Sequence, residues 1–287
     1  MNNVTTLNNK VTKAVDALEE ANLNFEVGQA EIMNTVTGKI SNKKKSLYRT
    51  DTGEELGVVG TNYQPVQNIT AFSYFDTICE LEGAQYKEII SFNGGEKVIL
   101  KAEFPQPAIV GKNDEVRKQF CLVNGFNGSV GVMANFMVNR LVCSNGMRAT
   151  VKDAQSSFKF KHTANVQFRM EDALQVLAKG TSYFDHFIRL STELTQKFVD
   201  AKMVDTFLDD CFGKSESKRA EAKRDEIQGY FERGIGNEGK TAWDLYNGIT
   251  EYVTHHHGKS EDTRVEYANF GGGVKLSEKA FNSAMAL

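Results

Sequence analysis

The sequence is poor in cysteine, and its cysteines do not form a metal-binding or redox pair. Cys79, Cys121, Cys143 and Cys211 are the only four among 287 residues, and no two have the spacing of a CxxC motif. A structural zinc site is usually built from closely spaced ligands, so this spacing argues against zinc. We expect the four thiols to be reduced and buried, as in proteins of a reducing compartment.

Long apolar runs are also missing. No stretch reaches the length of a membrane span, and the first ten residues, MNNVTTLNNK, are polar. The sequence therefore predicts no membrane partner and a location in the cytoplasm where the chain is made. The net charge of −3 argues against general coating of nucleic acid but leaves room for a local basic groove.

Motifs of common catalytic and nucleotide-binding sites are missing or lie in the wrong context. There is no GxSxG and no HExxH, and no GxGxxG follows a predicted strand. Residues 234–241, GIGNEGKT, have the GxxxxGK[ST] spacing, but the segment before them, 227–231, is predicted as a helix and not as the strand that precedes a phosphate-binding loop. Gly271–Gly273 precede a helix predicted from Ser277, but a lone glycine run is weak evidence for an anion site. The sequence thus predicts no cofactor and favours a protein that is not an enzyme.

What the sequence does contain is a central hairpin predicted over residues 119–147, with its turn at 125–129. Along its second strand, one face collects Val130, Val132, Ala134, Phe136, Val138 and Val142, and the other collects Met133, Asn135, Met137 and Asn139. Arg140 interrupts the apolar face near its end. Methionines beside amides are typical of a surface that meets a partner, so we expect a homo-oligomer.

The first 168 residues otherwise read as hairpins and short helices. We expect a helix over 9–22, a strand over 25–33, a hairpin over 48–60, a helix over 71–82 and a hairpin of strands 86–92 and 97–104. Gly83 should end the helix before it, and Pro105 and Pro107 should end the last strand.

From Met170 the apolar spacing becomes helical. It predicts one long helix to about residue 208 with a break near Gly180, a charged linker or helix start over 213–225, and helices over 227–231 and 242–256. The predicted fold class is α+β: antiparallel β-hairpins packed on helices in a domain of residues 1–168, followed by a mostly helical part, 169–287.

Two segments are rich in cations. Residues 35–50 carry Lys39, Lys43, Lys44, Lys45 and Arg49 without an acid, which we interpret as a solvated loop. Residues 148–169 carry Arg148, Lys152, Lys159, Lys161 and Arg169 against Asp153, so five cations less one acid leave a charge of about +4.

In an extended Phe158–Lys161 segment, phenylalanines and lysines point to opposite faces. The aromatic rings would anchor the strand, and the lysines would form an outward ridge suited to a phosphate backbone. The alternative is an edge strand whose lysines discourage aggregation.

A polar stripe is predicted on the helix over 241–257. Asn247, Glu251 and His255 follow one another at i, i+4 spacing. Glu251 and His255 supply at most two metal ligands, and a third would have to come from elsewhere. Hydrogen bonding along the helix is the simpler use of this stripe, so we predict no metal.

Four ordered blocks resemble a known family. They are LYRTDTGEELGVVGTNYQPVQN at 47–68, NRLVCSNGM at 139–147, KFKHTANV at 159–166 and TAWDLYNGITEYVTHH at 241–256. Together they are similar to the phage/plasmid-like family known as domain of unknown function 932, over about residues 25–285. The resemblance implies a mobile genetic element in a host cytoplasm and brings no catalytic residues. One departure is Ser144, where similar sequences often place threonine.

Two functions remain open at this point. The predicted order of hairpins and helices is similar in outline to the phage recombination annealases, which bind DNA in a basic groove and assemble as rings or filaments. This favours a non-enzymatic protein that binds and anneals single-stranded DNA in recombination or replication. The alternative is a counter-defence protein that binds a host protein. A metal-dependent enzyme centred on Glu251 and His255 ranks third.

Overall fold

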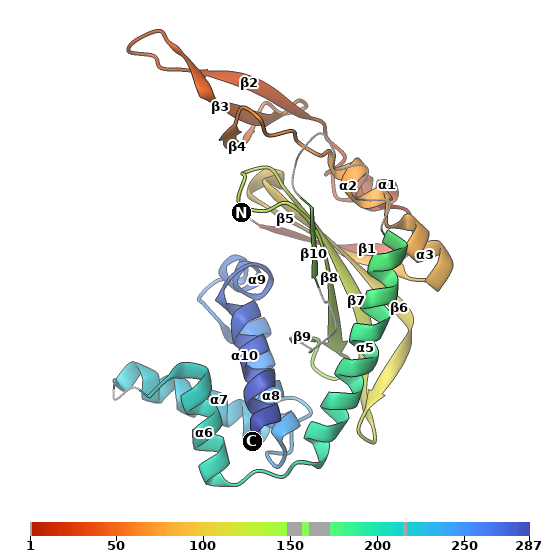
Figure 1. The fold of residues 1–287 in the computed structure, drawn as a ribbon, viewed down its shortest axis with the longest axis vertical. Helices are drawn as coiled ribbons and strands as arrows, with labels where there is room; N and C mark the ends of the chain where they lie inside the picture. The colour runs from red at the N-terminus through yellow and green to blue at the C-terminus, as the bar shows by residue number, and fades with distance from the viewer. Residues whose placement is uncertain (1, 148–156, 161–172, 215–216) are drawn as a thin grey trace. The chain divides into compact units, whose positions relative to one another are not determined.

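The protein has an α+β fold whose helices are concentrated in the C-terminal part (Figure 1). The computed structural model describes residues 2–147, 157–160, 173–214 and 217–287. The strands are β1 (Asn3–Val11), β2 (Val27–Met33), β3 (Ile40–Arg49), β4 (Glu55–Gly60), β5 (Gln85–Phe92), β6 (Lys97–Val110), β7 (Asp114–Gly125), β8 (Val132–Arg140), β9 (Asn145–Met147) and β10 (Ser157–Phe160). The helices are α1 (Ala14–Glu20), α2 (Asn68–Ser73), α3 (Asp76–Glu82), α5 (Ala173–Gln196), α6 (Ala201–Phe212), α7 (Lys218–Arg233), α8 (Ala242–Glu251), α9 (Glu261–Asn269) and α10 (Gly272–Ala286), with a 3-10 turn η1 (Asn93–Gly95) and a π-helical turn η2 (Tyr252–His256). The predicted fold class is confirmed.

The chain forms two compact units. Unit 1 comprises residues 1–105, 119–135 and 157–178, and unit 2 comprises 106–118, 136–156 and 179–287. The predicted boundary between residues 168 and 169 lies outside the described residues.

The strands form two sheets. The larger has the order β1-β5-β6-β7-β8-β10, with β9 paired to β8, and the smaller has the order β2-β3-β4. The predicted hairpins β3–β4, β5–β6 and β7–β8 are confirmed. Glycines in the turns made two of these hairpins predictable from the sequence. Gly53 and Gly94 have φ of +76° and +71°, a conformation that glycine adopts without steric cost.

The N-terminus differs from the prediction of one helix over 9–22. Residues Asn3–Val11 form β1, which pairs antiparallel with β5, and the helix α1 starts only at Ala14. Pairing with the edge of a neighbouring strand satisfies backbone N–H and C=O groups that would have no partner at the end of a short helix. This pairing therefore prevails over the helical spacing of the apolar residues. Helix α1 then buries Ala14, Ala17 and Leu18 next to α2, β1 and β5.

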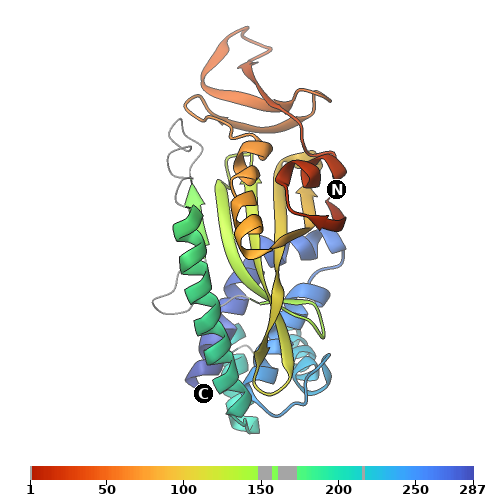
Figure 2. The same cartoon turned by 90° about the vertical axis from the view of Figure 1, so that its right-hand side faces the viewer.

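The core of unit 1 is aromatic. Figure 2 shows α2 and α3 lying along one face of the larger sheet, where the predicted stripe of Phe72, Phe75 and Ile78 is buried. The ring of Phe120 lies 6.2 Å from Phe75 between centroids and 5.8 Å from Phe104. The predicted helix over 71–82 is in fact two helices, and Gly83 ends the second with φ +66°, as predicted.

Strand β6 is longer than predicted. Pro105 and Pro107 do not end it, and it continues to Val110. The described pairing between β5 and β6 stops at Gln85 with Glu103, so neither proline has to donate a hydrogen bond to β5. Both prolines are exposed.

In unit 2, α5 runs unbroken through Gly180, where we predicted a break. A Cβ atom at this position would lie 2.2 Å from Cζ of Phe136. The glycine therefore provides space for a buried ring rather than a bend. The helix ends instead at Gln196, because the following residues pair with another segment: Val199 N–H donates to the Lys240 carbonyl, and Ala242 N–H donates to that of Lys197.

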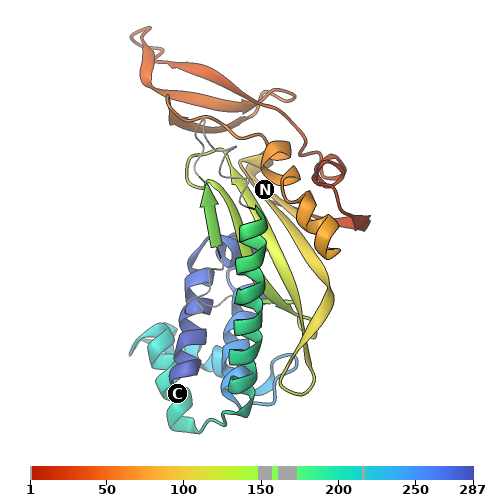
Figure 3. The same ribbon diagram turned by 45° about the vertical axis from the view of Figure 1, so that its right-hand side comes forward.

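Helix α8 is the centre of unit 2. All ten of its residues are buried, and it contacts α7, α10 and β9, while α10 also contacts α6 (Figure 3). The rings of Phe187 and Phe281 stack at 5.3 Å, and Trp243 lies edge-on to Phe187 at 6.5 Å. The predicted charged helix start before residue 225 is confirmed as the first half of α7.

The two faces of β8 differ from the predicted arrangement of a packed back and an open front. On the predicted front, Asn135 and Met137 are buried and only Met133 and Asn139 are half-buried. Val142, assigned to the packed face, lies beyond the strand and is 54% exposed. The chain therefore covers much of the face from which we expected self-association, and self-association itself stays a prediction.

Candidate functional site

The predicted cationic ridge is described only at one position. Lys159 lies on β10 opposite Met133 of β8 and is exposed, while Phe158 beside it is buried. The alternation of lysine outward and phenylalanine inward is thus confirmed for this pair. The other predicted cations, Arg148, Lys152, Lys161 and Arg169, lie outside the described residues.

The first cationic segment forms a strand, which corrects our interpretation of it as a loop. Residues 40–49 are β3, held between β2 and β4 by antiparallel pairing. Lys43 and Lys44 are exposed, and within the described residues neither forms an ion pair. Elsewhere in unit 1, Lys13 pairs with Glu80 and Lys101 pairs with Glu88. The exposed strand lysines of this unit without an ion pair among the described residues are Lys10 on β1, Lys43 and Lys44 on β3 and Lys159 on β10.

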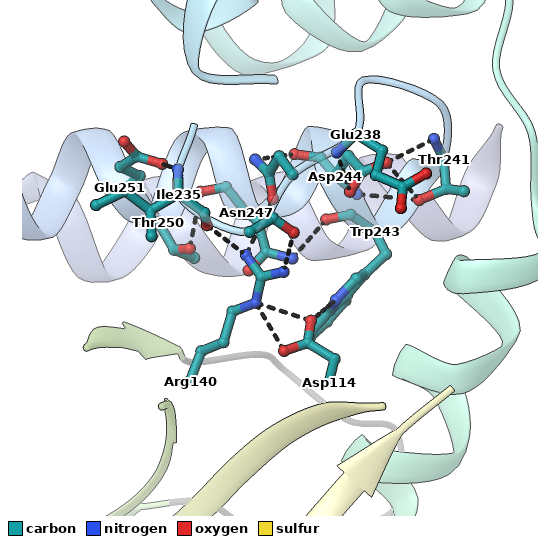
Figure 4. Close-up of polar contacts among 12 residues, drawn as sticks. Asp114, Arg140, Ile235, Glu238, Thr241, Trp243, Asp244, Asn247, Thr250 and Glu251 are labelled. Atoms are coloured by element: carbon teal, nitrogen blue, oxygen red, sulfur yellow. Dashed lines mark hydrogen bonds and ion pairs between the residues drawn. The ribbon is translucent and has the colours of Figure 1, made fainter. Parts of the chain in front are cut away.

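An extensive polar network in unit 2 is centred on Arg140 (Figure 4). Its Nε donates to both carboxylate oxygens of Asp114 at 3.0 and 2.8 Å. Its Nη atoms donate to the carbonyls of Ile235 and Gly236 and to Oδ1 of Asn237, at 3.2, 2.7 and 3.0 Å. The indole Nε1 of Trp243 donates to Asp114 at 2.7 Å. Arg140 thus connects the loop before α8 to the start of β7 and the end of β8. From the sequence we had noted this residue only as an interruption of an apolar face.

The start of α8 is built around a second carboxylate. Thr241 and Asp244 form a capping box, and Asp244 also accepts a hydrogen bond from the backbone N–H of Lys240 at 3.0 Å. Asn237 completes the loop by donating to the carbonyls of Tyr230 and Asp244. Figure 4 shows the side chains of Thr241 and Asp244 directed at each other, so the carboxylate of Asp244 holds the start of the helix.

Asn247, Glu251 and His255 do not form the predicted shared stripe. Asn247 is fully buried and donates to the Trp243 carbonyl at 2.9 Å. Glu251 accepts a hydrogen bond from the backbone N–H of Ile235 at 3.1 Å. The π-helical turn after α8 rotates His255 away, and its Nε2 lies 2.8 Å from the Cys143 carbonyl.

The histidine that Glu251 does approach is His256, at 3.8 Å. Asn247, Glu251 and His255 thus each make a hydrogen bond to the backbone, although the buried Oδ1 of Asn247 has no partner among the described residues. Among the described residues, no group of three or more histidine, cysteine, aspartate or glutamate side chains is arranged to hold a metal ion.

His257 packs in an aromatic setting after α8. Its ring stacks on Tyr267 with centroids 3.4 Å apart, and its Nδ1 lies 2.7 Å from the hydroxyl of Tyr252. Partial burial, and then the positive charges of Lys223 and Arg264, lower the pKa of His257 below its usual range.

A cavity of about 880 Å³ opens beside the Arg140 network in unit 2. Its wall includes Asp114, Arg140, Trp243 and the 72% exposed Phe198. The first three of these side chains are bound to one another, and Glu238 and Lys240 on the rim form an ion pair at 2.9 Å. The cavity has the volume of a small-molecule site, but its charged groups are largely neutralised by each other.

The four cysteines are all buried and none forms a disulfide, as predicted. Burial raises the pKa of the thiols of Cys79 and Cys211 to about 12. These thiols are therefore packing groups rather than nucleophiles.

The described architecture is that of an α+β protein with two small units, a lysine-bearing strand layer in one and a buried arginine–aspartate network in the other. The family model described as Domain of unknown function (DUF932) matches residues 55–270, and the chain belongs to this family. The matched region contains the whole of β8, β10, α8 and η2, which carry parts of three of the four blocks singled out in the sequence. No curated protein and no solved structure matches the chain. In the part of the chain that the structure describes, no helix is long and apolar enough to cross a membrane.

Proposed function

We propose that this protein binds single-stranded DNA without catalysing a reaction, and that it anneals strands in recombination or replication of a mobile genetic element in the host cytoplasm. The supporting observation is the set of exposed lysines on strands of unit 1 that have no ion-pair partner among the described residues. Lys10 on β1, Lys43 and Lys44 on β3 and Lys159 on β10 belong to this set, and we call the last three the strand lysines.

The charge distribution favours a polyanionic ligand. A chain with a net charge of −3 repels nucleic acid on average, so binding requires a local cluster of cations. A lysine already paired with a carboxylate gains little from a phosphate, because it exchanges one partner for another. The strand lysines are free of this competition, and each phosphate they contact would release condensed counterions.

The strand lysines favour binding that does not depend on sequence. Lysine ammonium groups on an exposed strand approach phosphates as point charges, which gives affinity without sequence preference. This is the behaviour that annealing requires, because complementary strands of any sequence must be accepted. We propose further that the bound form is a homo-oligomer, since annealing brings two coated strands together.

A charge-removal series tests the proposal. Lys43→Gln, Lys44→Gln and Lys159→Gln together should weaken binding of a mixed-sequence oligonucleotide at fixed salt and leave base preference unchanged. The matched control removes three exposed lysines of unit 2, Lys202, Lys214 and Lys259, which also have no ion pair among the described residues. The control variant has the same net charge, so it separates a local contact from a general charge effect.

Equal loss of affinity in both triple variants would contradict a site on the strand lysines. The alternative function, binding of a host protein, would be supported if the wild-type protein bound no oligonucleotide at low salt but retained one host protein at high salt.

A further inference from the structure

The hairpin formed by β2 and β3 has an unusual tip. Met33 and Ile40 face each other across the hairpin and are each 56% exposed, and Val36 between them is 92% exposed. Figures 1 and 3 show this hairpin extending beyond the other strands of the smaller sheet. Other exposed aliphatic side chains of unit 1, such as Val4 and Leu81, lie on separate elements.

Hydrogen bonds define the conformation of the hairpin tip. Oδ1 of Asn34 accepts hydrogen bonds from the backbone N–H groups of Val36 and Thr37, both at 3.0 Å. The N–H of Asn34 donates to the Lys39 carbonyl at 2.9 Å, and Gly38 takes the left-handed conformation with φ +66° that closes the turn. Val36 is thus held outward by a turn whose backbone groups are satisfied, and its exposure is a property of the fold.

Cations continue from the tip along β3. Lys39, Lys43 and Lys44 are exposed, and none has an ion pair among the described residues; Glu31 is the only acid of the hairpin strands. The pairing with β2 is irregular here: Lys45 lies opposite Glu31 and Ile40 lies opposite Met33, so β3 carries extra residues in a bulge that includes Lys43 and Lys44. Apolar groups at the tip with positive charge gathered behind them suit a polyanion that also offers apolar faces.

DNA has this combination, since its phosphates form a line of charge and its bases offer flat apolar faces. Proteins that distort DNA commonly insert isoleucine or methionine between bases while cations hold the backbone. An anionic lipid surface would meet the apolar tip and the lysines behind it, but it would leave the exposed Lys159, on β10 of the other sheet, without a partner.

We propose that the β2–β3 hairpin is a base-contacting arm, in which Met33, Val36 and Ile40 pack against or between the bases of a DNA strand whose phosphates are held by the lysines of β3. This inference rests on the proposed function, because it assigns a role within the same DNA complex. Such an arm would unstack neighbouring bases and so prepare a single strand for pairing with its complement.

The test compares three proteins on an oligonucleotide that contains 2-aminopurine, a base whose fluorescence rises when it is unstacked. Wild-type protein should increase the fluorescence on binding. The variant Met33→Ser, Val36→Ser, Ile40→Ser should bind about tenfold more weakly, a loss of about 1.4 kcal/mol, with an unchanged salt dependence and without the fluorescence increase. Leu81→Ser, which removes a 63% exposed leucine of α3, is the control and should behave as wild type.

A second variant adds an aromatic ring instead of removing contacts. Val36→Trp should bind more tightly than wild type, because base–aromatic stacking contributes about 1–3 kcal/mol per base. Its new indole fluorescence should be quenched by the oligonucleotide, whereas the native Trp243, which is buried, should contribute little to the change. Circular dichroism melting should show that both tip variants remain folded, because the changed side chains are exposed.

The outcomes separate this inference from the proposed function. If wild-type protein binds the oligonucleotide but the serine variant binds equally well and gives the same fluorescence increase, the proposed base-contacting role of the hairpin is wrong, and the proposal of DNA binding is unaffected. If wild-type protein does not bind DNA, both proposals are contradicted. Loss of binding to phosphatidylserine vesicles in the serine variant, with unchanged DNA binding, would overturn the inference in favour of a membrane contact.

Discussion

Arg140 and Asp114 lie 26 positions apart in the sequence, yet Nε of the arginine donates to both carboxylate oxygens of the aspartate, at 3.0 and 2.8 Å. The pair is largely withdrawn from solvent, with side-chain exposures of 3% and 15%. Because the same guanidinium also holds the carbonyls of Ile235 and Gly236, this contact fixes the loop that leads into the buried helix α8.

Removing the aspartate should be costly. Asp114→Ala leaves the buried Arg140 charge without its counter-ion and should lower the free energy of unfolding by about 3–5 kcal/mol. Asp114→Asn keeps an acceptor for Trp243 and should cost less. Urea denaturation measures both, and Glu238→Gln, which breaks the exposed pair with Lys240, is the control that should leave stability nearly unchanged. Equal losses for Asp114→Ala and Glu238→Gln would contradict this role.

Two glycine substitutions in helices should have opposite effects. Alanine normally stabilises a helix interior by about 1 kcal/mol over glycine, and Gly229→Ala in α7 should do so, because its nearest atom beyond the helix backbone, Nη2 of Arg233, would be 3.6 Å away. Gly180→Ala should instead destabilise by about 1–3 kcal/mol, since its Cβ would overlap the buried ring of Phe136. The melting temperatures of the two variants provide the comparison. A Gly180→Ala protein that melts above wild type would refute the packing described for α5.

The pH dependence of stability should contain a contribution from His257. The pKa of this histidine is lowered in the folded protein by burial and by Lys223 and Arg264, so the unfolded chain takes up a proton more readily. The folded state should therefore lose stability as the pH falls through about 6.5, the ordinary value. His257→Gln should show a smaller fall in melting temperature between pH 8 and pH 5.5. An identical fall in both proteins would argue against this assignment.

Thiol labelling should report the packing of the cysteines. Because burial raises the pKa of Cys79 and Cys211 to about 12, and all four cysteines are buried, the folded protein should react slowly with a disulfide reagent at pH 8. All four should react quickly in guanidinium chloride. Rapid reaction of one thiol in the folded protein would reveal an accessible site that the structure does not contain.

The sequence predicted those parts of the fold that depend on local chemistry. The turns at Gly53, Gly94 and Gly83 need a backbone conformation that glycine favours, and each was located correctly. The family match over residues 55–270 likewise confirms a resemblance carried by short ordered blocks. The helical character of the C-terminal part followed from apolar spacing that persists over many residues.

The errors concern residues whose structure is set by distant partners. The lysines of β3 show no apolar alternation, so nothing local indicated that β2 and β4 would hold them in a strand. Glycine usually weakens a helix, so we predicted a break at Gly180. The sequence does not show that the ring of Phe136 packs against this position. The spacing of Glu251 and His255 was correct for an α-helix, but the π-helical turn shifted the histidine, and no spacing rule contains that shift.

The measurement that tests DNA binding most directly is a salt titration of the affinity of wild-type protein for a single-stranded oligonucleotide. Three phosphate contacts by Lys43, Lys44 and Lys159 predict a logarithmic slope of about −2 or steeper, at about 0.7 per contact, and Lys43→Gln with Lys44→Gln should flatten it by about 1.4. Absence of binding at low salt, or a slope that the two substitutions leave unchanged, would contradict the account.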